Sequence, residues 1–191
     1  MRAPGAGSAV SGDSVERPDA GGPVTLHPYR TPPGFPLPFH TALPGGFRPR
    51  ADLRGPGATV RFTWTPGGER RDSAFVYLRV MEDGTREGGA REIVRTAAER
   101  LRIPGDRTEL QPRHDHPWAM VEYRIRSEGT SGVPVQGWVA LGERDGRWFY
   151  VITQATVDAW ARFAPRAELI LEELRWAGVD GRPGQEGLDE R

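Results

Sequence analysis

Most of the metal-binding potential of this chain lies in one short segment, RHDHPW, at residues 113–118. If that segment is extended, residues two apart point to the same side, so His114 and His116 could bind one zinc, copper or nickel ion. Asp115 would then point away from the metal. A stable site also needs a third ligand, and His40 could supply it only if the proline-rich segment beside it crosses to this loop.

The same letters also fit a polar turn. Pro112 and Pro117 bracket the histidines, and a strand is predicted to begin directly afterwards at Trp118. Two histidines make an incomplete metal site, because structural zinc sites use four protein ligands and catalytic ones three. We therefore favour the turn and predict no metal or other cofactor. A metal-binding protein or metal-dependent hydrolase that uses His114 and His116 is the alternative.

Other catalytic chemistry lacks its characteristic residues. The chain has no cysteine and no lysine, which excludes thiolate metal sites, cysteine nucleophiles, Schiff-base lysines and P-loop lysines. The GTSG segment at 129–132 is not the G-x-S-x-G nucleophile motif. No catalytic residue is predicted, and we expect a protein that is not an enzyme. Its candidate carboxylates are predicted to be solvated at strand ends or on an outer helix face: Glu82, Asp83, Glu122, Glu143, Glu172 and Glu173.

Charge and hydropathy narrow the class of partner. The 191 residues carry 26 basic and 26 acidic side chains, so the formal net charge is zero. Nucleic-acid binding normally needs a basic excess, so no nucleic-acid partner is predicted. No apolar run is long enough to span a membrane, and the N-terminus has no apolar core of a secretory signal. The sequence as written therefore predicts a cytoplasmic protein, or a cell-envelope or secreted one if a signal precedes it.

The order of apolar patterns predicts a mostly antiparallel sheet with helices. A stripe at helical spacing predicts a middle helix at 88–102. Pro165 lacks an amide hydrogen, so a short helical turn is predicted to end near Ala164 and a C-terminal helix to start at Pro165. Apolar residues on both strand faces predict an α/β (α+β) fold, an α/β/α sandwich whose central sheet is covered by both helices. The predicted strands are 58–64, 73–82, 118–128, 134–143 and 147–155.

Composition divides the chain into three parts. Residues 1–37 are predicted to form a disordered and proline-rich N-terminal segment, because they lack apolar periodicity. Residues 38–177 are predicted to form the folded domain. Residues 178–191 are predicted to form a disordered polar tail.

Aromatic residues supply the candidate binding surfaces. Trp118, Trp138 and Trp148 cluster in the predicted meander, and Trp160 follows it. Core packing is the favoured interpretation, and a partly open groove for a partner segment or an apolar ligand is the alternative. For binding through the sheet, the predicted residues are Trp118, Trp138 and Trp148. For binding through the proline-rich segment, they are Tyr29, Phe35 and Phe39.

Two segments carry a resemblance to a known family. FHTALPGGF at 39–47 resembles the first strand and turn of the PsbP-like superfamily, and the segment 145–176 resembles its last hairpin strand, tryptophan-bearing turn and C-terminal helix. This superfamily includes the extrinsic PsbP subunit of photosystem II, Mog-type Ran-binding proteins and bacterial DcrB-type proteins. The resemblance implies a non-catalytic domain that docks to a larger assembly, and it carries over no active-site residue.

The sequence thus predicts a non-catalytic binding or assembly module that docks to a protein partner. A carrier of a small apolar ligand is a further alternative, and it requires a cavity above about 300 Å³ lined by the aromatic residues.

Overall fold

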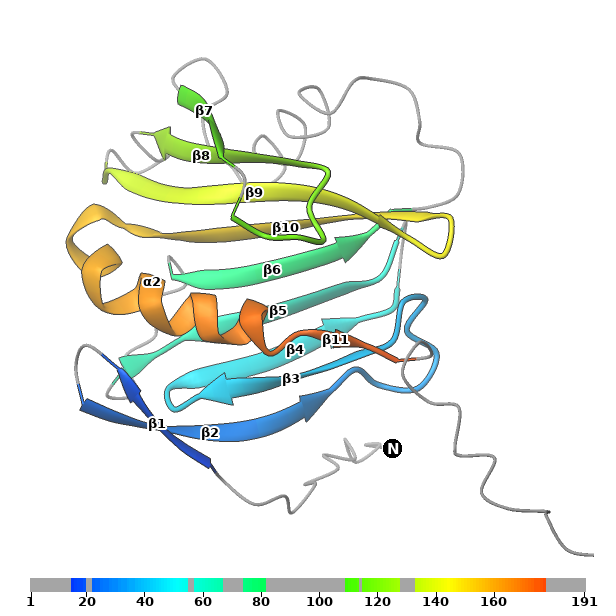
Figure 1. Cartoon of the computed structure of the whole chain (residues 1–191), viewed down its shortest axis with the longest axis horizontal. Coiled ribbons are helices and arrows are strands. Elements are labelled where there is room, and N and C mark those ends of the chain that lie inside the picture. Colours follow the sequence, from blue (N-terminus) through cyan, green and yellow to red (C-terminus); the bar gives the residue numbers. More distant parts are fainter. Residues whose placement is uncertain are drawn as a thin grey trace, which may run out of the picture.

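The fold combines two antiparallel sheets with one helix in the described part of the chain (Figure 1). A computed structural model describes residues 15–19, 22–54, 57–66, 74–81, 109–113, 115–127 and 133–177. The larger sheet has seven strands in the order β4 (Phe47–Asp52), β5 (Thr59–Trp64), β6 (Phe75–Val80), β10 (Arg147–Thr156), β9 (Val135–Arg144), β8 (Val121–Ser127) and β7 (Glu109–Arg113). The smaller sheet has four, in the order β1 (Val15–Asp19), β2 (Gly22–Arg30), β3 (Phe39–Pro44) and β11 (Arg175–Trp176).

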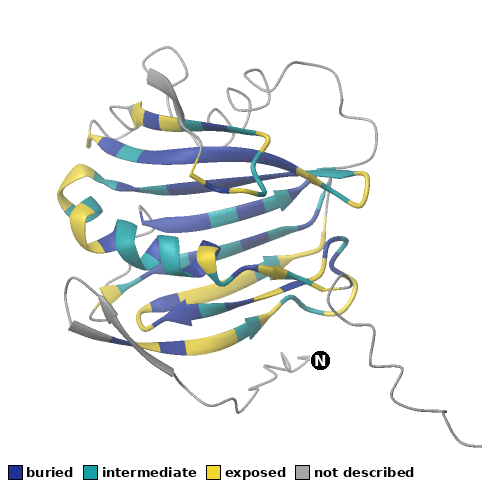
Figure 2. Ribbon diagram, viewed as in Figure 1, coloured by how far each residue is buried: buried dark blue, intermediate teal, exposed yellow. Residues whose placement is uncertain are grey.

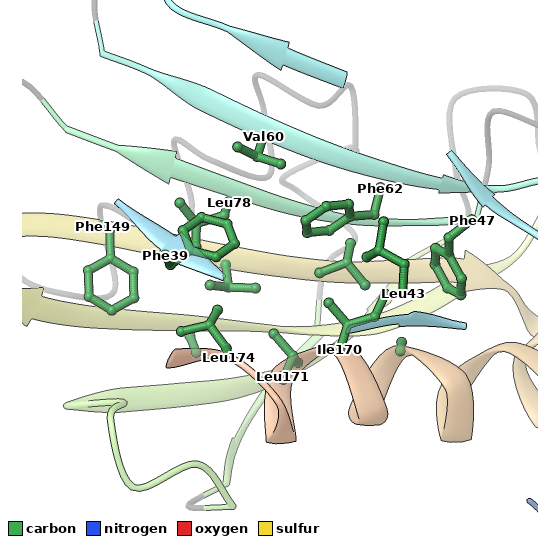
Figure 3. Packing of buried hydrophobic residues seen from close by; sticks show 14 of the residues in the cluster. Phe39, Leu43, Phe47, Val60, Phe62, Leu78, Phe149, Ile170, Leu171 and Leu174 are labelled. Atoms are coloured by element: carbon green, nitrogen blue, oxygen red, sulfur yellow. The ribbon is translucent and has the colours of Figure 1, made fainter. Parts of the chain in front are cut away.

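Helix α2 (Val157–Glu172) and strand β3 lie over the same face of the seven-stranded sheet (Figure 1). Ile170 and Leu171 of the helix and Leu43 of β3 are buried there against the sheet residues Val60, Phe62, Leu78 and Phe149 (Figure 3). The side chains of the second face form a separate buried cluster, which includes Phe75, Val139, Leu141, Tyr150 and Ile152. The strands are therefore apolar on both faces, as predicted, and buried residues run along the central strands (Figure 2).

The predicted fold class is confirmed: the molecule is α+β, with a mostly antiparallel sheet and a C-terminal helix. The predicted hairpin at Asp145 and Gly146 is also present, and both residues have positive φ, 51° and 73°, as the favoured two-residue turn requires. The predicted middle helix at 88–102 and the predicted tail at 178–191 lie outside the described residues. No helix in the described ranges is long and apolar enough to cross a membrane.

The C-terminal helix differs from the prediction because it runs without a break through Pro165. A proline inside a helix loses the hydrogen bond to the carbonyl four residues earlier, which here belongs to the exposed Ala161. The apolar stripe continues across the proline, since Phe163 on one side and Ala167 on the other are both buried against the sheet. Packing of that stripe outweighs the lost hydrogen bond.

Residues 22–37, which belong to the segment predicted to be disordered, form a strand and a packed segment. Strand β2 pairs with β3 from Leu26↔Pro44 to Arg30↔His40, and the following segment buries Phe35 and Leu37 in the core. Strand β1 covers β2 only as far as Leu26, so β2 has an open edge at Pro28, where a missing amide hydrogen costs no sheet hydrogen bond. Prolines here mark an edge of the sheet.

Candidate functional site

Residues 116–119, which include the end of the RHDHPW segment, form a tight turn just before β8 begins. The backbone amide of Ala119 donates to the carbonyl of His116 at 3.0 Å, with Pro117 at the second position of the turn, which favours proline. The amide of Met120 donates to the carbonyl of Leu141 in β9 at 2.8 Å and fixes the turn to the sheet. The polar turn expected here is therefore present, and strand β8 begins three residues after Trp118, at Val121.

The side chain of His116 is buried and joins two carboxylates from different elements. Its Nδ1 donates to Oε1 of Glu122 in β8 at 2.7 Å, and its Nε2 donates to Oε2 of Glu168 in α2 at 3.0 Å. Oε2 of Glu122 also accepts from the backbone amides of Asp115 and His116, at 2.9 and 3.3 Å. This arrangement holds the turn, the sheet and the helix together.

These contacts set the protonation state of His116. Burial alone would lower its pKa, but hydrogen bonds to Glu122 and Glu168 and the negative charges of both carboxylates raise the pKa to about 9. Both ring nitrogens therefore carry a proton at neutral pH. An imidazolium has no lone pair, so His116 in this state can neither bind a metal nor act as a general base.

The geometry also argues against a metal centre in the described residues. The two carboxylates lie on opposite nitrogens of the ring, and therefore cannot converge with His116 on one ion. No group of three or more His, Asp or Glu side chains is placed to hold a metal within the ranges that the structure describes. His40 is exposed on β3, where it pairs with Arg175 of β11, and His114 lies outside the described residues.

Aromatic rings surround the buried imidazole. The ring of His116 lies 5.1 Å from that of Trp118 and 4.8 Å from that of Trp138, measured between centroids. Trp118 contacts Phe149 at 5.7 Å, and Phe149 contacts Trp176 at 4.8 Å. Trp118 and Trp176 are only partly buried, whereas Phe149 between them is buried.

An open pocket of about 590 Å³ lies between this turn, the last turns of α2 and strand β11. Apolar and ionisable side chains are mixed around it, which suits a ligand that has both kinds of group. Its lining consists of Asp115, His116, Pro117, Trp118, Glu168, Leu171, Glu172, Leu174, Arg175 and Trp176.

The structure separates the three tryptophans predicted for binding through the sheet. Trp118 lines the pocket, whereas Trp138 lies beneath His116 with 1% of its surface exposed. Trp148 packs against the buried cluster on the opposite face of the sheet. For the proline-rich segment, Phe35 and Phe39 are buried in the core, and Tyr29 packs against Phe62 with ring centroids 4.9 Å apart.

Three residues of this site were not found from the sequence. Glu122 was predicted to be solvated and is instead 1% exposed, because it accepts three hydrogen bonds from the adjoining turn. Glu168 lies 52 residues from His116 in the sequence, and only the packing of α2 on the sheet brings them together. Trp176 follows the helix, and no periodic pattern marks its position.

Comparisons with known proteins do not assign the chain to a family. No protein-family model and no curated protein matches the chain. The chain is similar to the solution structure of cyanobacterial PsbP from Synechocystis sp. PCC 6803, with 14% sequence identity. That similarity covers 79% of this chain and 92% of the other, with a TM-score of 0.48. A TM-score below 0.5 does not establish a shared fold, so the PsbP-like assignment stays a prediction.

Proposed function

We propose that this protein is a non-catalytic binding module that docks a segment of a protein partner into the pocket between Trp118 and Trp176. The observation that supports this function best is the pairing of partly exposed aromatic rings with a rigid, ion-paired support. Tryptophan is enriched among the residues that contribute most to protein–protein binding. Trp138, which was predicted to contact a ligand directly, would act from below by supporting His116 and Trp118.

Fixed geometry favours binding over chemistry at this pocket. The turn is anchored through Met120 and Leu141, and His116 is held from both sides by Glu122 and Glu168. A surface held in one conformation loses little conformational entropy when a partner binds, and this increases affinity. The same contacts occupy both nitrogens of the histidine that a catalytic mechanism would need.

Carriage of a small ligand is a second candidate, because the pocket volume exceeds the roughly 300 Å³ expected of a ligand site. Its lining does not favour an apolar ligand. Five of the ten lining residues are ionisable, namely Asp115, His116, Glu168, Glu172 and Arg175. A peptide segment, which combines charged and apolar groups, fits that lining better.

Partner capture with matched variants tests the proposal. The full chain is used as bait in a lysate of the source organism, as wild type, Trp118→Ala and Trp148→Ala. Trp148 is a suitable control because it lies on the opposite face of the sheet. We expect the wild type and Trp148→Ala to retain one reproducible partner, and Trp118→Ala to bind it at least about tenfold more weakly.

Two results would contradict the proposal. One is that no partner is recovered reproducibly. The other is that Trp118→Ala, shown to be folded by circular dichroism, retains the partner as well as the wild type does.

A further inference from the structure

The pocket lies along an edge of the four-stranded sheet. Strand β11 is the outermost strand of that sheet in the described part of the chain, and β3 is its neighbour on one side. The turn that precedes β8 lies on the other side of β11 (Figure 1), and Trp118 of this turn lines the same pocket as Arg175 and Trp176 of β11. A further strand paired with β11 would therefore lie in the pocket.

The backbone of Trp176 is directed toward such a strand. In an antiparallel sheet, successive residues point their N–H and C=O groups to opposite sides of the strand. The amide of Ala177 donates to the carbonyl of Pro38 at 2.8 Å, and Arg175 is paired with His40, so both of these residues face β3. Trp176 lies between them, and its N–H and C=O groups therefore point away from β3.

The other three outermost strands, β1, β4 and β7, each carry a proline that points out of the sheet. The case of β4 follows from its register with β5, in which the carbonyl of Gly46 accepts from the amide of Thr65 at 2.8 Å. Alternation from Gly46 directs Pro49 away from β5. Proline has no amide hydrogen, and an outward proline therefore hinders the addition of a strand at that edge.

The registers extend this alternation to the two remaining edges. In the four-stranded sheet, the carbonyl of Thr25 faces β3 and accepts from the amide of Gly45, and counting from there directs Pro18 of β1 outward. In the seven-stranded sheet, the carbonyl of Leu141 faces β8, and counting from there directs Pro112 of β7 outward. Among the four outermost strands of the described residues, β11 is thus the one without an outward proline.

An open edge beside a pocket suits one mode of peptide recognition. An extended segment can add to the edge of a sheet, where backbone hydrogen bonds supply affinity and pockets for its side chains supply specificity. A residue paired with Trp176 would direct its side chain to the same face as the indole. The apolar side chains of Trp118, Leu171 and Leu174 line the pocket there.

We propose that the partner segment docks in an extended conformation and adds a fifth strand to the four-stranded sheet at β11. Its backbone is hydrogen-bonded to the N–H and C=O groups of Trp176, and it places an apolar side chain in the pocket. This inference rests on the proposed function and names the conformation and the chemistry of the docked segment.

The space beside β11 favours a single segment over a second copy of this chain. The pocket is bounded on its far side by the turn that carries Trp118 and by the last turns of α2. In a second copy, β11 is backed by β3 and the rest of its sheet, which would have to enter the same space.

A peptide titration followed by NMR tests the assignment. The probe is the blocked pentapeptide acetyl-Ser-Thr-Leu-Thr-Ser-amide, whose single leucine sets the register, added to the full chain labelled with nitrogen-15. We expect the backbone amide signal of Trp176 to shift with a dissociation constant of about 1 to 10 mM. Ala51 is the control, because its amide points outward from β4 beside Pro49, and its signal should stay in place.

Two N-methylated peptides distinguish strand addition from side-chain binding. Neighbouring N–H groups of an extended peptide point to opposite sides, so only one of two adjacent N–H groups can face Trp176. One peptide carries its methyl group on the leucine nitrogen, the other on the nitrogen of the threonine that follows. We expect one of them to bind at least about tenfold more weakly than the parent peptide, and the other to bind within about twofold of it. Loss from the leucine peptide indicates antiparallel addition, and loss from the threonine peptide indicates parallel addition.

Equal binding of all three peptides would overturn the inference, as would equal loss from both N-methylated peptides or the absence of a shift at Trp176. A dimer in sedimentation experiments whose Trp176 amide is already protected from hydrogen exchange would also overturn it, because a second copy would then occupy the edge.

These failures are distinguishable from failure of the proposed function. If Trp118→Ala loses the captured partner while the peptides show no alternation, the module binds at this pocket through side chains alone. If the peptides show the alternation while no partner is captured, the edge binds extended segments and the proposed function fails.

Discussion

His116 connects three parts of the molecule through one side chain. The imidazole donates one charge-assisted hydrogen bond to Glu122 in β8 and another to Glu168 in α2. Its ring also packs against Trp118 and Trp138. Removing one partner from a buried ion pair leaves an uncompensated charge, which typically costs about 3 to 5 kcal/mol. The stability of this part of the molecule should therefore depend on the proton held by His116.

The free energy of unfolding should consequently decrease as the pH becomes alkaline. The pKa of His116 is about 9 in the folded protein and 6.5 in an unfolded chain, so between these pH values the folded state holds one more proton. This contribution, on the order of 3 kcal/mol, is present in full below pH 6.5, declines as pH rises and is lost once pH passes about 9. Urea unfolding at pH 6, 7.5, 9 and 10 measures it.

Two variants test this prediction: His116→Gln removes the titrating group, and His27→Gln is the control. His27 is exposed on β2, so its replacement should leave the decline between pH 6.5 and 9 unchanged. The decline should be absent from His116→Gln. If His116→Gln retains the same decline as the wild type, the buried imidazole is not its source.

For single residues, the sequence predicts the turn around Pro117 but not the two carboxylates that pair with His116. Pro117 and the polar residues around it mark a turn by their own local preferences. Strand alternation places Glu122 on the same face as Arg124 and Arg126, which are exposed, so the pattern alone gives no sign that Glu122 is buried. Burial of Glu122 depends on how the preceding turn folds back, and that is a three-dimensional property.

At the scale of elements, strand β9 packs very closely at Gly142 against Phe149 of β10 and against the backbone of Trp118. A Cβ atom at this position would lie 2.5 Å from Cζ of Phe149 and 2.8 Å from the carbonyl oxygen of Trp118. Glycine is thus required where β9 passes between the backbone of Trp118 and the ring of Phe149.

Gly142→Ala should therefore lower the free energy of unfolding by about 1 to 3 kcal/mol, because a backbone carbonyl and a packed ring must both move. Chemical denaturation measures the change. Gly45→Ala is the matched control, since its Cβ would meet only the carbonyl of Thr25 at 3.9 Å. Equal denaturation midpoints for Gly142→Ala and the wild type would show that the strand accommodates the methyl group.

Alternation of apolar residues is a local property, and it predicts the central strands well.

The two predictions based on proline, a helix break at Pro165 and disorder around Pro28, are wrong for the same reason. Pro165 does not end the helix and Pro28 does not keep β2 out of the sheet, because each lies where the lost hydrogen bond faces solvent or an open edge. Only the tertiary arrangement determines whether the amide hydrogen that proline lacks would have pointed toward a hydrogen-bonding partner or toward solvent.

For the molecule as a whole, Trp176 joins the two sheets. Its ring contacts Phe39 of the four-stranded sheet at 5.8 Å and Phe149 of the seven-stranded sheet at 4.8 Å. Strand β11, which carries it, pairs with β3. Nearby, the hydroxyl of Thr41 in β3 donates to the carbonyl of Ile170 in α2, a residue 129 positions later in the sequence.

Trp176→Ala should lower the free energy of unfolding by about 2 to 3 kcal/mol, somewhat less than for a fully buried tryptophan, because the ring is partly exposed. Met120→Ala serves as the control, since Met120 is 57% exposed and should change the value by less than about 0.5 kcal/mol. Urea unfolding of both variants at pH 7 measures the difference. A loss for Trp176→Ala as small as that for Met120→Ala would mean that the sheets hold together without this ring.

The pairing of β11 with β3 also has a consequence for the order of events during protein synthesis. The ribosome completes β3 and the RHDHPW turn long before it reaches Trp176, so one wall of the pocket is missing from every shorter nascent chain. Until that residue emerges, the edge of β3 at Phe39 and His40 has no β11 to pair with. On the proposed function, a partner segment should therefore dock only after translation has passed this point, and not while the chain is still being made.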